Sequence, residues 1–174
     1  MTSADLDAVA IFEVLERRHV QYVVIGGYAA ELHWSSRRTV DVDVVPATTL
    51  ENLDRLAGAL HDLSARIRVE SEPDGLPFRT SGEALRVMKT LNLLTRHGEL
   101  DLTFTPSGTE GYVDLVRSAV RVRVGQVDVL IAALGDVIRS KTAAGRPKDI
   151  VALPELRALA AGRSDDEPPP SAEL

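Results

Sequence analysis

The stretch Tyr22-Val23-Val24-Ile25-Gly26-Gly27-Tyr28-Ala29-Ala30, followed by Arg38-Thr39-Val40-Asp41-Val42-Asp43-Val44-Val45, decides the fold. The apolar run 22–25 is typical of a short buried strand, which the two glycines end before a helix predicted over 28–34. The strict alternation over 39–45 predicts a second strand, which Pro46 ends. Valines occupy one face of this strand, and Thr39, Asp41 and Asp43 occupy the other.

The paired glycines Gly26 and Gly27 stand where a strand passes into a helix. Residues without a Cβ let backbone N–H groups approach a phosphate, and a helix N-terminus adds a favourable dipole. A tight strand–helix turn without any ligand explains the same pair equally well. The glycines alone therefore do not identify a phosphate site.

Two carboxylates distinguish the second strand. Asp41 and Asp43 are two positions apart, so their side chains leave the same face roughly 7 Å apart at Cα. Neighbouring carboxylates repel each other unless a cation lies between them, and aspartate is disfavoured in strands. Magnesium prefers carboxylate oxygens together with substrate phosphates, so the pair predicts a Mg²⁺ site. The alternative is an exposed sheet face that carries two solvated acids.

A third acid, Asp101, lies in the alternating run Leu100-Asp101-Leu102-Thr103-Phe104. Its side chain is expected to share a face with Thr103 and Thr105, opposite the apolar residues. If this strand is a neighbour of the Asp41 strand, three acids converge. Such a cluster suits two-metal phosphoryl transfer, in which metal ions activate an attacking hydroxyl and stabilise departing pyrophosphate.

The remaining pattern predicts an α+β fold with a mixed β-sheet flanked by helices and a C-terminal helical segment. A first helix is expected from Ser3, as its N-cap, to Arg18, and a capping box of Thr48 and Glu51 opens another helix that ends near Leu63. The other expected elements are a strand over 67–70, a loop over 71–83, hairpins over 87–95 with 99–105 and over 120–124 with 127–131, helices over 109–118 and 134–144, and a helical segment from Pro147 that Pro154 divides before Ala161.

Composition limits the function classes. The chain has 174 residues, of which 44% are hydrophobic, enough for a core. It has no cysteine, which excludes disulfide scaffolds, cysteine zinc fingers, iron–sulfur clusters and cysteine nucleophiles. Four of the acids responsible for the net charge of −6 lie in the Pro-rich stretch 164–174, so the body is nearly neutral and a strongly basic nucleic-acid clamp is disfavoured.

We expect one domain over 1–163 and a disordered acidic tail over 164–174. No run approaches the ~18 apolar residues of a membrane span, and the N-terminus carries acids where a secretory signal carries positive charge. The sequence therefore predicts a cytoplasmic protein without a membrane partner.

Together with the later run Lys141-Thr-Ala-Ala-Gly-Arg146-Pro-Lys148-Asp149, the glycine and aspartate motifs resemble the DNA polymerase β-like nucleotidyltransferase superfamily. Within it, the chain is similar to the branch of AbiEii/MenT-type nucleotidyltransferase toxins, over roughly residues 20–160. Many superfamily members have Gly-Ser at the glycine pair, whereas this chain has Gly27 in the second place.

The resemblance implies a role for each matching residue. It implies that Gly26 and Gly27 hold the triphosphate of an NTP, and that Asp41 and Asp43 bind Mg²⁺. Asp101 would be the third acid of the metal site and would assist deprotonation of the acceptor. Lys141 would contact the triphosphate, and Arg146 and Asp149 would complete that wall of the nucleotide site. Apart from the resemblance, Arg38 could steer phosphate or RNA, or it could be an ordinary surface arginine.

The implied reaction moves a nucleoside monophosphate from an NTP to an acceptor hydroxyl. By resemblance the acceptor is the 3′ end of tRNA, the protein is the toxin of a toxin–antitoxin pair, and an antitoxin protein is encoded separately. Two alternatives stay open: transfer to a protein side chain or a small molecule such as an aminoglycoside, and a catalytically weak nucleotide-binding module. A tRNA acceptor requires a basic groove, for which the candidates are Arg66, Arg68, Arg79, Arg86, Lys89, Arg96, Arg121 and Arg123.

Overall fold

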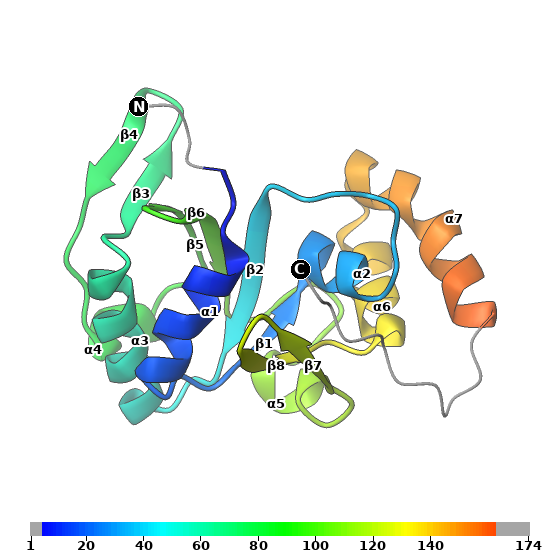
Figure 1. Ribbon diagram of the computed structural model, residues 1–174, viewed down its shortest axis with the longest axis horizontal. Coiled ribbons are helices and arrows are strands. Elements are labelled where there is room, and N and C mark those ends of the chain that lie inside the picture. Colours follow the sequence, from blue (N-terminus) through cyan, green and yellow to red (C-terminus); the bar gives the residue numbers. More distant parts are fainter. Residues whose placement is uncertain (1–4, 163–174) are drawn as a thin grey trace.

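The computed structural model describes residues 5–162 and has the expected α+β fold, with helices around one mixed sheet (Figure 1). In chain order the elements are α1 (Ala8–Arg17), β1 (Tyr22–Ile25), α2 (Gly26–Leu32), β2 (Asp41–Pro46), α3 (Leu50–Asp62), β3 (Arg66–Val69), β4 (Glu72–Pro77), α4 (Gly82–Arg86), β5 (Thr90–Thr95), β6 (Gly98–Thr103), α5 (Tyr112–Leu115), β7 (Val120–Val124), β8 (Val127–Ile131), α6 (Leu134–Ala144) and α7 (Pro147–Ala161).

The sheet has the strand order β4-β3-β5-β6-β2-β1-β8-β7. Two neighbouring pairs are parallel, β2 with β6 and β1 with β8, and the other pairs are antiparallel. All four residues of β1 are buried, which is why this strand reads as a continuous apolar run. The order places the aspartate strand β2 in the middle of the sheet, between β6 and β1.

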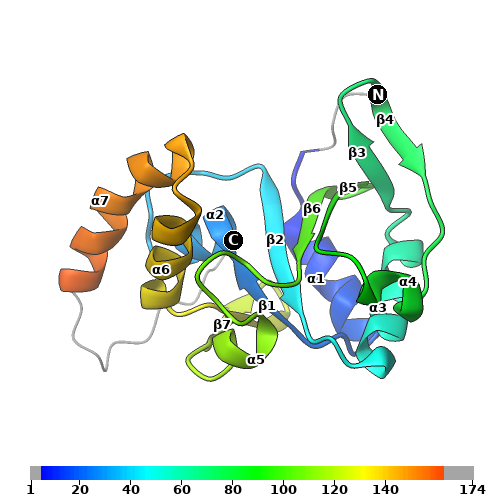
Figure 2. The same ribbon diagram turned by 180° about the vertical axis from the view of Figure 1, so that it is seen from behind.

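The helices divide between the two ends of the sheet. Figures 1 and 2 show α3 and α4 beside β3 to β6, and α2, α6 and α7 at the opposite end, whereas α1 contacts both α3 and β8. The core is aliphatic, with one small aromatic group in which Phe12 stacks on Tyr22 and meets Tyr28 edge-on, at ring-centre distances of 6.1 and 5.6 Å. This packing fixes α1 against the start of β1 and α2, so the glycine pair has a rigid base.

Helix starts differ from the expected positions. Asp7 caps α1 by accepting a hydrogen bond from the Ala10 amide at 3.0 Å, whereas the expected cap Ser3 lies outside the described residues. Helix α2 begins at Gly26 rather than at residue 28. Thr49, not Thr48, caps α3 by accepting from the Asn52 amide at 3.4 Å. Each shift is small because helix termini are set by local cap geometry.

Two expectations about breaks in structure are wrong. The expected loop 71–83 contains β4 and the first residues of α4. Prolines and a glycine mark a loop in sequence, yet β4 is the edge strand of the sheet, where proline needs no partner on its outer side. Pro154 does not divide α7, which is continuous. The helix continues through Pro154, although proline has no N–H and one backbone hydrogen bond of the helix is therefore missing.

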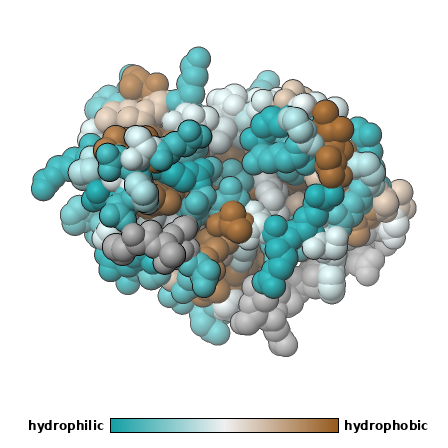
Figure 3. Space-filling view, turned by 90° about the horizontal axis from the view of Figure 1, so that it is seen from above, coloured by the Kyte–Doolittle hydropathy of each residue, from teal (hydrophilic) through white to brown (hydrophobic). Residues whose placement is uncertain are grey.

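The predicted tail 164–174 lies outside the described residues. Within residues 5–162, no helix combines the length and the apolar character required to cross a bilayer. Seen from above, most of this surface is hydrophilic, and hydrophobic residues form separate patches on it (Figure 3).

Candidate active site

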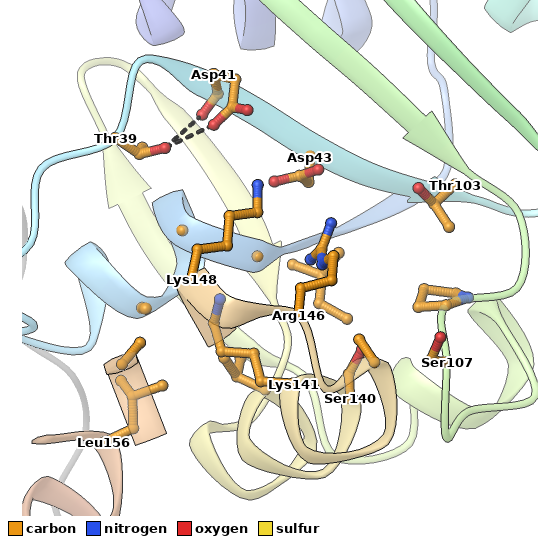
Figure 4. A pocket seen from close by; sticks show the side chains of 18 of the residues that line it. Thr39, Asp41, Asp43, Thr103, Ser107, Ser140, Lys141, Arg146, Lys148 and Leu156 are labelled. Carbon is orange, nitrogen blue, oxygen red and sulfur yellow. Dashed lines mark hydrogen bonds between the residues drawn. The ribbon is translucent and has the colours of Figure 1, made fainter. Parts of the chain in front are cut away.

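A cavity of about 520 Å³ opens where β1 passes into α2. Gly26 and Gly27 line it together with Asp41 and Asp43. In Figure 4 the two aspartates lie across the cavity from Lys141, Arg146 and Lys148, which come from α6 and from the start of α7. Segments far apart in the chain therefore meet here. The candidate phosphate residues and the candidate metal residues line the same cavity.

The three acids lie on one face of the sheet, as expected. Strands β2 and β6 are parallel neighbours in a register that pairs Asp43 with Asp101 and Asp41 with Glu99. Register partners point to the same side of a sheet, so Asp101 shares the face of the two β2 aspartates. Val40, however, is exposed and precedes β2, so the valine face begins at Val42. The register therefore brings three acids to one face of the sheet.

Asp43 has the most unfavourable electrostatic surroundings of the three. Burial, and then the charges of Asp41 and Asp101, raise its pKa from 3.8 to about 7, while Lys148 and Arg146 act in the opposite direction. Asp41 is instead bound by the Thr39 hydroxyl, which donates to its carboxylate at 2.6 Å. A partly buried carboxylate beside like charges is a group that a cation would stabilise.

Asp101 is held by a residue that sequence reasoning did not connect to it. Nη2 of Arg68, on β3, donates to both carboxylate oxygens of Asp101 at 3.0 and 2.9 Å, and Arg68 also pairs with Glu99. Burial and the charge of Asp41 raise the pKa of Asp101, and Arg68 opposes that rise. Asp101 is not among the described residues that line the cavity. The sequence near Arg68 does not indicate this pairing, because β5 lies between β3 and β6 in the sheet and the contact depends on the order of the strands.

The glycine pair allows close approach of backbone to the acids. Gly26 has φ of +73°, and a Cβ at this position would lie 2.2 Å from Oδ2 of Asp43. A Cβ on Gly27 would lie 2.8 Å from the hydroxyl oxygen of Thr39. Both glycines are therefore required sterically, Gly26 by its backbone conformation as well.

A cationic cluster forms the opposite wall. Asp149 on α7 is fully buried and accepts hydrogen bonds from Lys141 Nζ at 3.1 Å and from Arg146 Nε at 2.6 Å. Burial alone would raise the pKa of Asp149, but the hydrogen bonds from Arg146 and Lys141 hold it below its ordinary value. The cluster Lys141–Asp149–Arg146 thus joins α6 to α7 with a net charge of +1.

Lys148, which precedes Asp149, was not singled out as a site residue. It is exposed at the start of α7 and lines the cavity, and its side chain extends toward Asp41 and Asp43 in Figure 4. The run Lys148-Asp149 on the first turn of a helix sends one side chain to the cavity and the other into the core. Lys148 belongs to the run 141–149 that the sequence analysis quotes. The sequence does not show, however, that the side chain of Lys148 points to the cavity while that of its neighbour Asp149 is buried.

The loop 33–40 is fixed to α7. Glu155 accepts from the Ser36 amide at 2.6 Å and pairs with Arg37 at 3.5 Å. Arg38 also lines the cavity, but its side chain is 89% exposed and its pairing with Glu31, at 3.8 Å, is loose.

Hydroxyl side chains that sequence reasoning did not single out line another part of the cavity: Thr90, Thr103, Thr105, Ser107 and Ser140.

The carboxylates of the cavity fit Mg²⁺. Asp41 and Asp43 lie on one face of β2, both partly buried, and the negative charges around Asp43 disfavour its ionised form. They fit an ion that binds one or two protein carboxylates and completes its shell with water and phosphate. Across residues 5–162, no group of three acidic, His or Cys side chains is close enough to hold a metal by itself. Asp101 would join the ligands only after leaving Arg68.

The eight candidate groove residues do not form one surface. Arg121 and Arg123 lie on β7, at one edge of the sheet, whereas Arg66 and Arg68 lie on β3 near the other edge. Arg68 and Arg123 are also paired with acids. A single basic groove made of all eight is therefore excluded.

Comparison with models of known protein families finds no match to this chain, and comparison with curated proteins finds no significant match. Comparison with solved structures finds nucleotidyltransferase folds. The crystal structure of the lincosamide antibiotic adenylyltransferase LnuA, with lincomycin bound, aligns with a TM-score of 0.58 at 14% identity, over 87% of this chain and 95% of that one. The antibiotic-resistance factor ANT(2'')-Ia, in solution, aligns with a TM-score of 0.57 at 15% identity, over 89% and 82%.

A third similar structure is a putative nucleotidyltransferase from Thermotoga maritima, with a TM-score of 0.51 at 15% identity over 90% of this chain and 91% of that one. At these identities the similarity establishes the fold and leaves the chemistry to the residues. The chain has the nucleotidyltransferase fold over most of its length.

Proposed function

We propose that this protein is a magnesium-dependent nucleotidyltransferase, which moves a nucleoside monophosphate from an NTP to an acceptor hydroxyl and releases pyrophosphate. One observation carries the proposal: in a nucleotidyltransferase fold, Asp41 and Asp43 lie beside Gly26-Gly27 in a cavity whose other wall is cationic. Carboxylates for a metal, backbone for a phosphate and cations for released charge are the parts that this reaction needs.

The two glycines and the two β2 aspartates would hold and orient the NTP. Gly26 and Gly27 permit the triphosphate to approach the backbone, and Asp41 and Asp43 would hold Mg²⁺ against it. Bound there, Mg²⁺ would orient the phosphates and stabilise the charge that develops on them. The cluster Lys141–Asp149–Arg146 and the exposed Arg38 would face the triphosphate from the other side.

Asp101 is assigned to the acceptor. In the proposed step the acceptor oxygen bonds to the α-phosphorus, the bond from that phosphorus to the bridging oxygen breaks, and pyrophosphate departs with the bonding electrons. The proton of the hydroxyl would pass to Asp101, whose raised pKa suits a group that takes up a proton, once the acceptor reaches this carboxylate beside the cavity. Arg68 holds the carboxylate in place through both oxygens.

The acceptor that the resemblance implies is the 3′ end of tRNA, with the protein acting as a toxin neutralised by an antitoxin. A second candidate comes from the fold neighbours, since LnuA is described with lincomycin bound and ANT(2'')-Ia in complex with adenylyl-2''-tobramycin. On that basis a small-molecule hydroxyl is the second candidate acceptor.

A transfer assay tests both the proposed nucleotidyl transfer and the identity of the acceptor. Purified protein is incubated in Mg²⁺ with each α-labelled NTP and, separately, with total tRNA, an aminoglycoside and a lincosamide. Label appearing in tRNA supports the toxin hypothesis, and label in an antibiotic supports the second candidate. Absence of pyrophosphate release with every acceptor, under conditions in which the protein is folded, would remove the proposed activity.

A further inference from the structure

The chain contains three lysines, Lys89, Lys141 and Lys148, and two of them line the cavity. The resemblance assigns the triphosphate contact to Lys141. The contacts of the two cavity lysines differ, however, and this difference bears on which of them has a charge available to a ligand.

Lys141 already forms an ion pair with Asp149. Its side chain is only 13% exposed, and its ammonium lies 3.1 Å from a carboxylate that has no exposed surface. Withdrawing Lys141 toward a phosphate would leave Asp149 with Arg146 as its single cationic partner among the described residues. Separating a buried pair costs several kcal/mol unless both groups find new partners, so Lys141 is expected to stay in place.

Arg146 is paired with the same carboxylate. Its Nε and Nη2 both donate to Asp149, at 2.6 and 3.3 Å. Arg37 of the 33–40 loop is also engaged, with Glu155 and with the Val151 carbonyl. Arg38 of the same loop pairs with Glu31 only loosely, at 3.8 Å. Most of the positive charge around the cavity therefore supports the protein's own structure.

Lys148 is different. It is exposed and lines the cavity, and no ion pair within 4.0 Å holds it in the part of the chain that the structure describes. Its ammonium extends toward the two β2 aspartates in Figure 4, and its charge acts on Asp43. A flexible lysine that faces both acids from across the cavity has a compact charge that can move onto a phosphate oxygen.

We propose that Lys148 is the cation that binds the triphosphate directly, and that Lys141 is a positioning residue, which Asp149 holds so that α6 and the first turn of α7 present Lys148 to the cavity. The inference rests on the proposed nucleotidyl transfer and assigns the phosphate contact within that same site. It departs from the role that the resemblance implies for Lys141.

The test compares Lys148→Ala, Lys141→Ala and the matched control Lys89→Ala, a lysine that does not line the cavity. Calorimetry measures binding of inorganic tripolyphosphate and of each NTP in Mg²⁺, and thermal unfolding is recorded for every variant. Lys148→Ala is expected to weaken both ligands roughly tenfold or more at an unchanged melting temperature, because it removes one charged hydrogen bond to phosphate. Lys148→Arg should restore part of the affinity.

Lys141→Ala is expected to lower the melting temperature and to weaken tripolyphosphate binding less than Lys148→Ala does, because the lysine that contacts phosphate remains while its positioning is loosened. The inference is overturned if Lys148→Ala binds tripolyphosphate as tightly as Lys89→Ala does, or if Lys141→Ala loses as much affinity as Lys148→Ala at an unchanged melting temperature. A wild-type protein that binds neither tripolyphosphate nor any NTP overturns the proposed function with it. Wild-type binding that Lys148→Ala leaves intact overturns this inference alone.

Discussion

Gly26 lies so close to Asp43 that a Cβ on the glycine would stand 2.2 Å from Oδ2 of the carboxylate. The contact joins the turn that follows β1 to the acid at the centre of the sheet. It makes the glycine part of the same unit as the candidate metal ligand, because neither can be enlarged or moved without displacing the other.

Gly26→Ala should damage both folding and transfer. The new methyl group would displace the Asp43 side chain, and φ of +73° is unfavourable for alanine, so we expect about 1–3 kcal/mol of destabilisation. The matched control is Gly135→Ala in α6, where nothing lies within 4 Å of the added Cβ and a helical alanine is favoured by about 1 kcal/mol. Urea unfolding compares the two; equal stabilities would show that the contact is not tight.

Asp41→Asn and Asp43→Asn should each lower nucleotidyl transfer in Mg²⁺ by about 100-fold or more, because each removes a carboxylate assigned to the metal. In metal-free buffer Asp43→Asn should be more stable than the wild type by about 1 kcal/mol or more, since it removes a charge that burial and two acids disfavour. Asp128→Asn, on the exposed face of β8, is the control. Near-normal transfer by either variant would refute the metal assignment.

Asp149→Asn should destabilise the protein by about 3 kcal/mol, because it leaves Lys141 with little exposure and no carboxylate. Lys141→Met should also destabilise it. The double variant should lose less than the sum of the two, since each single change removes the same interaction. Chemical unfolding of the three proteins measures the coupling, and strict additivity would mean that the two side chains do not interact.

The same pair predicts a pH dependence of stability. The folded pKa of Asp149 lies below its ordinary value of 3.8, so the stability that its charge contributes is present above the unfolded pKa and is lost as pH falls through the folded pKa. Wild-type unfolding free energy should therefore fall with acidification below about pH 4, and more steeply than that of Asp149→Asn. Parallel curves for the two proteins would contradict the prediction.

The local patterns of the sequence predicted much of the fold. The bounds of β7, β8 and α6 match the expected ranges, and β1 and β2 lie where their apolar and alternating runs placed them. These elements depend on the period of hydrophobic residues and on nearby breakers, which are local properties. The sequence did not predict edge strand β4, because its prolines and glycine are typical of a loop. The strand is stabilised by its pairing with β3, which is not a local property of its sequence.

The sequence by itself determined which chemical groups the protein has: a glycine pair after a strand, two aspartates on one strand face, a third on another strand, and a cluster of cations near the C-terminal helix. Only the tertiary structure decided which of these groups are already engaged. Arg68 binds Asp101 across the sheet, and Asp149 binds Lys141 and Arg146, while Lys148 keeps its charge in the cavity. Such pairings follow from burial, which makes an unpartnered charge costly. Arg68 and Asp101 come from separate strands, and the order of residues within the run 141–149 does not say which of its charges are buried together.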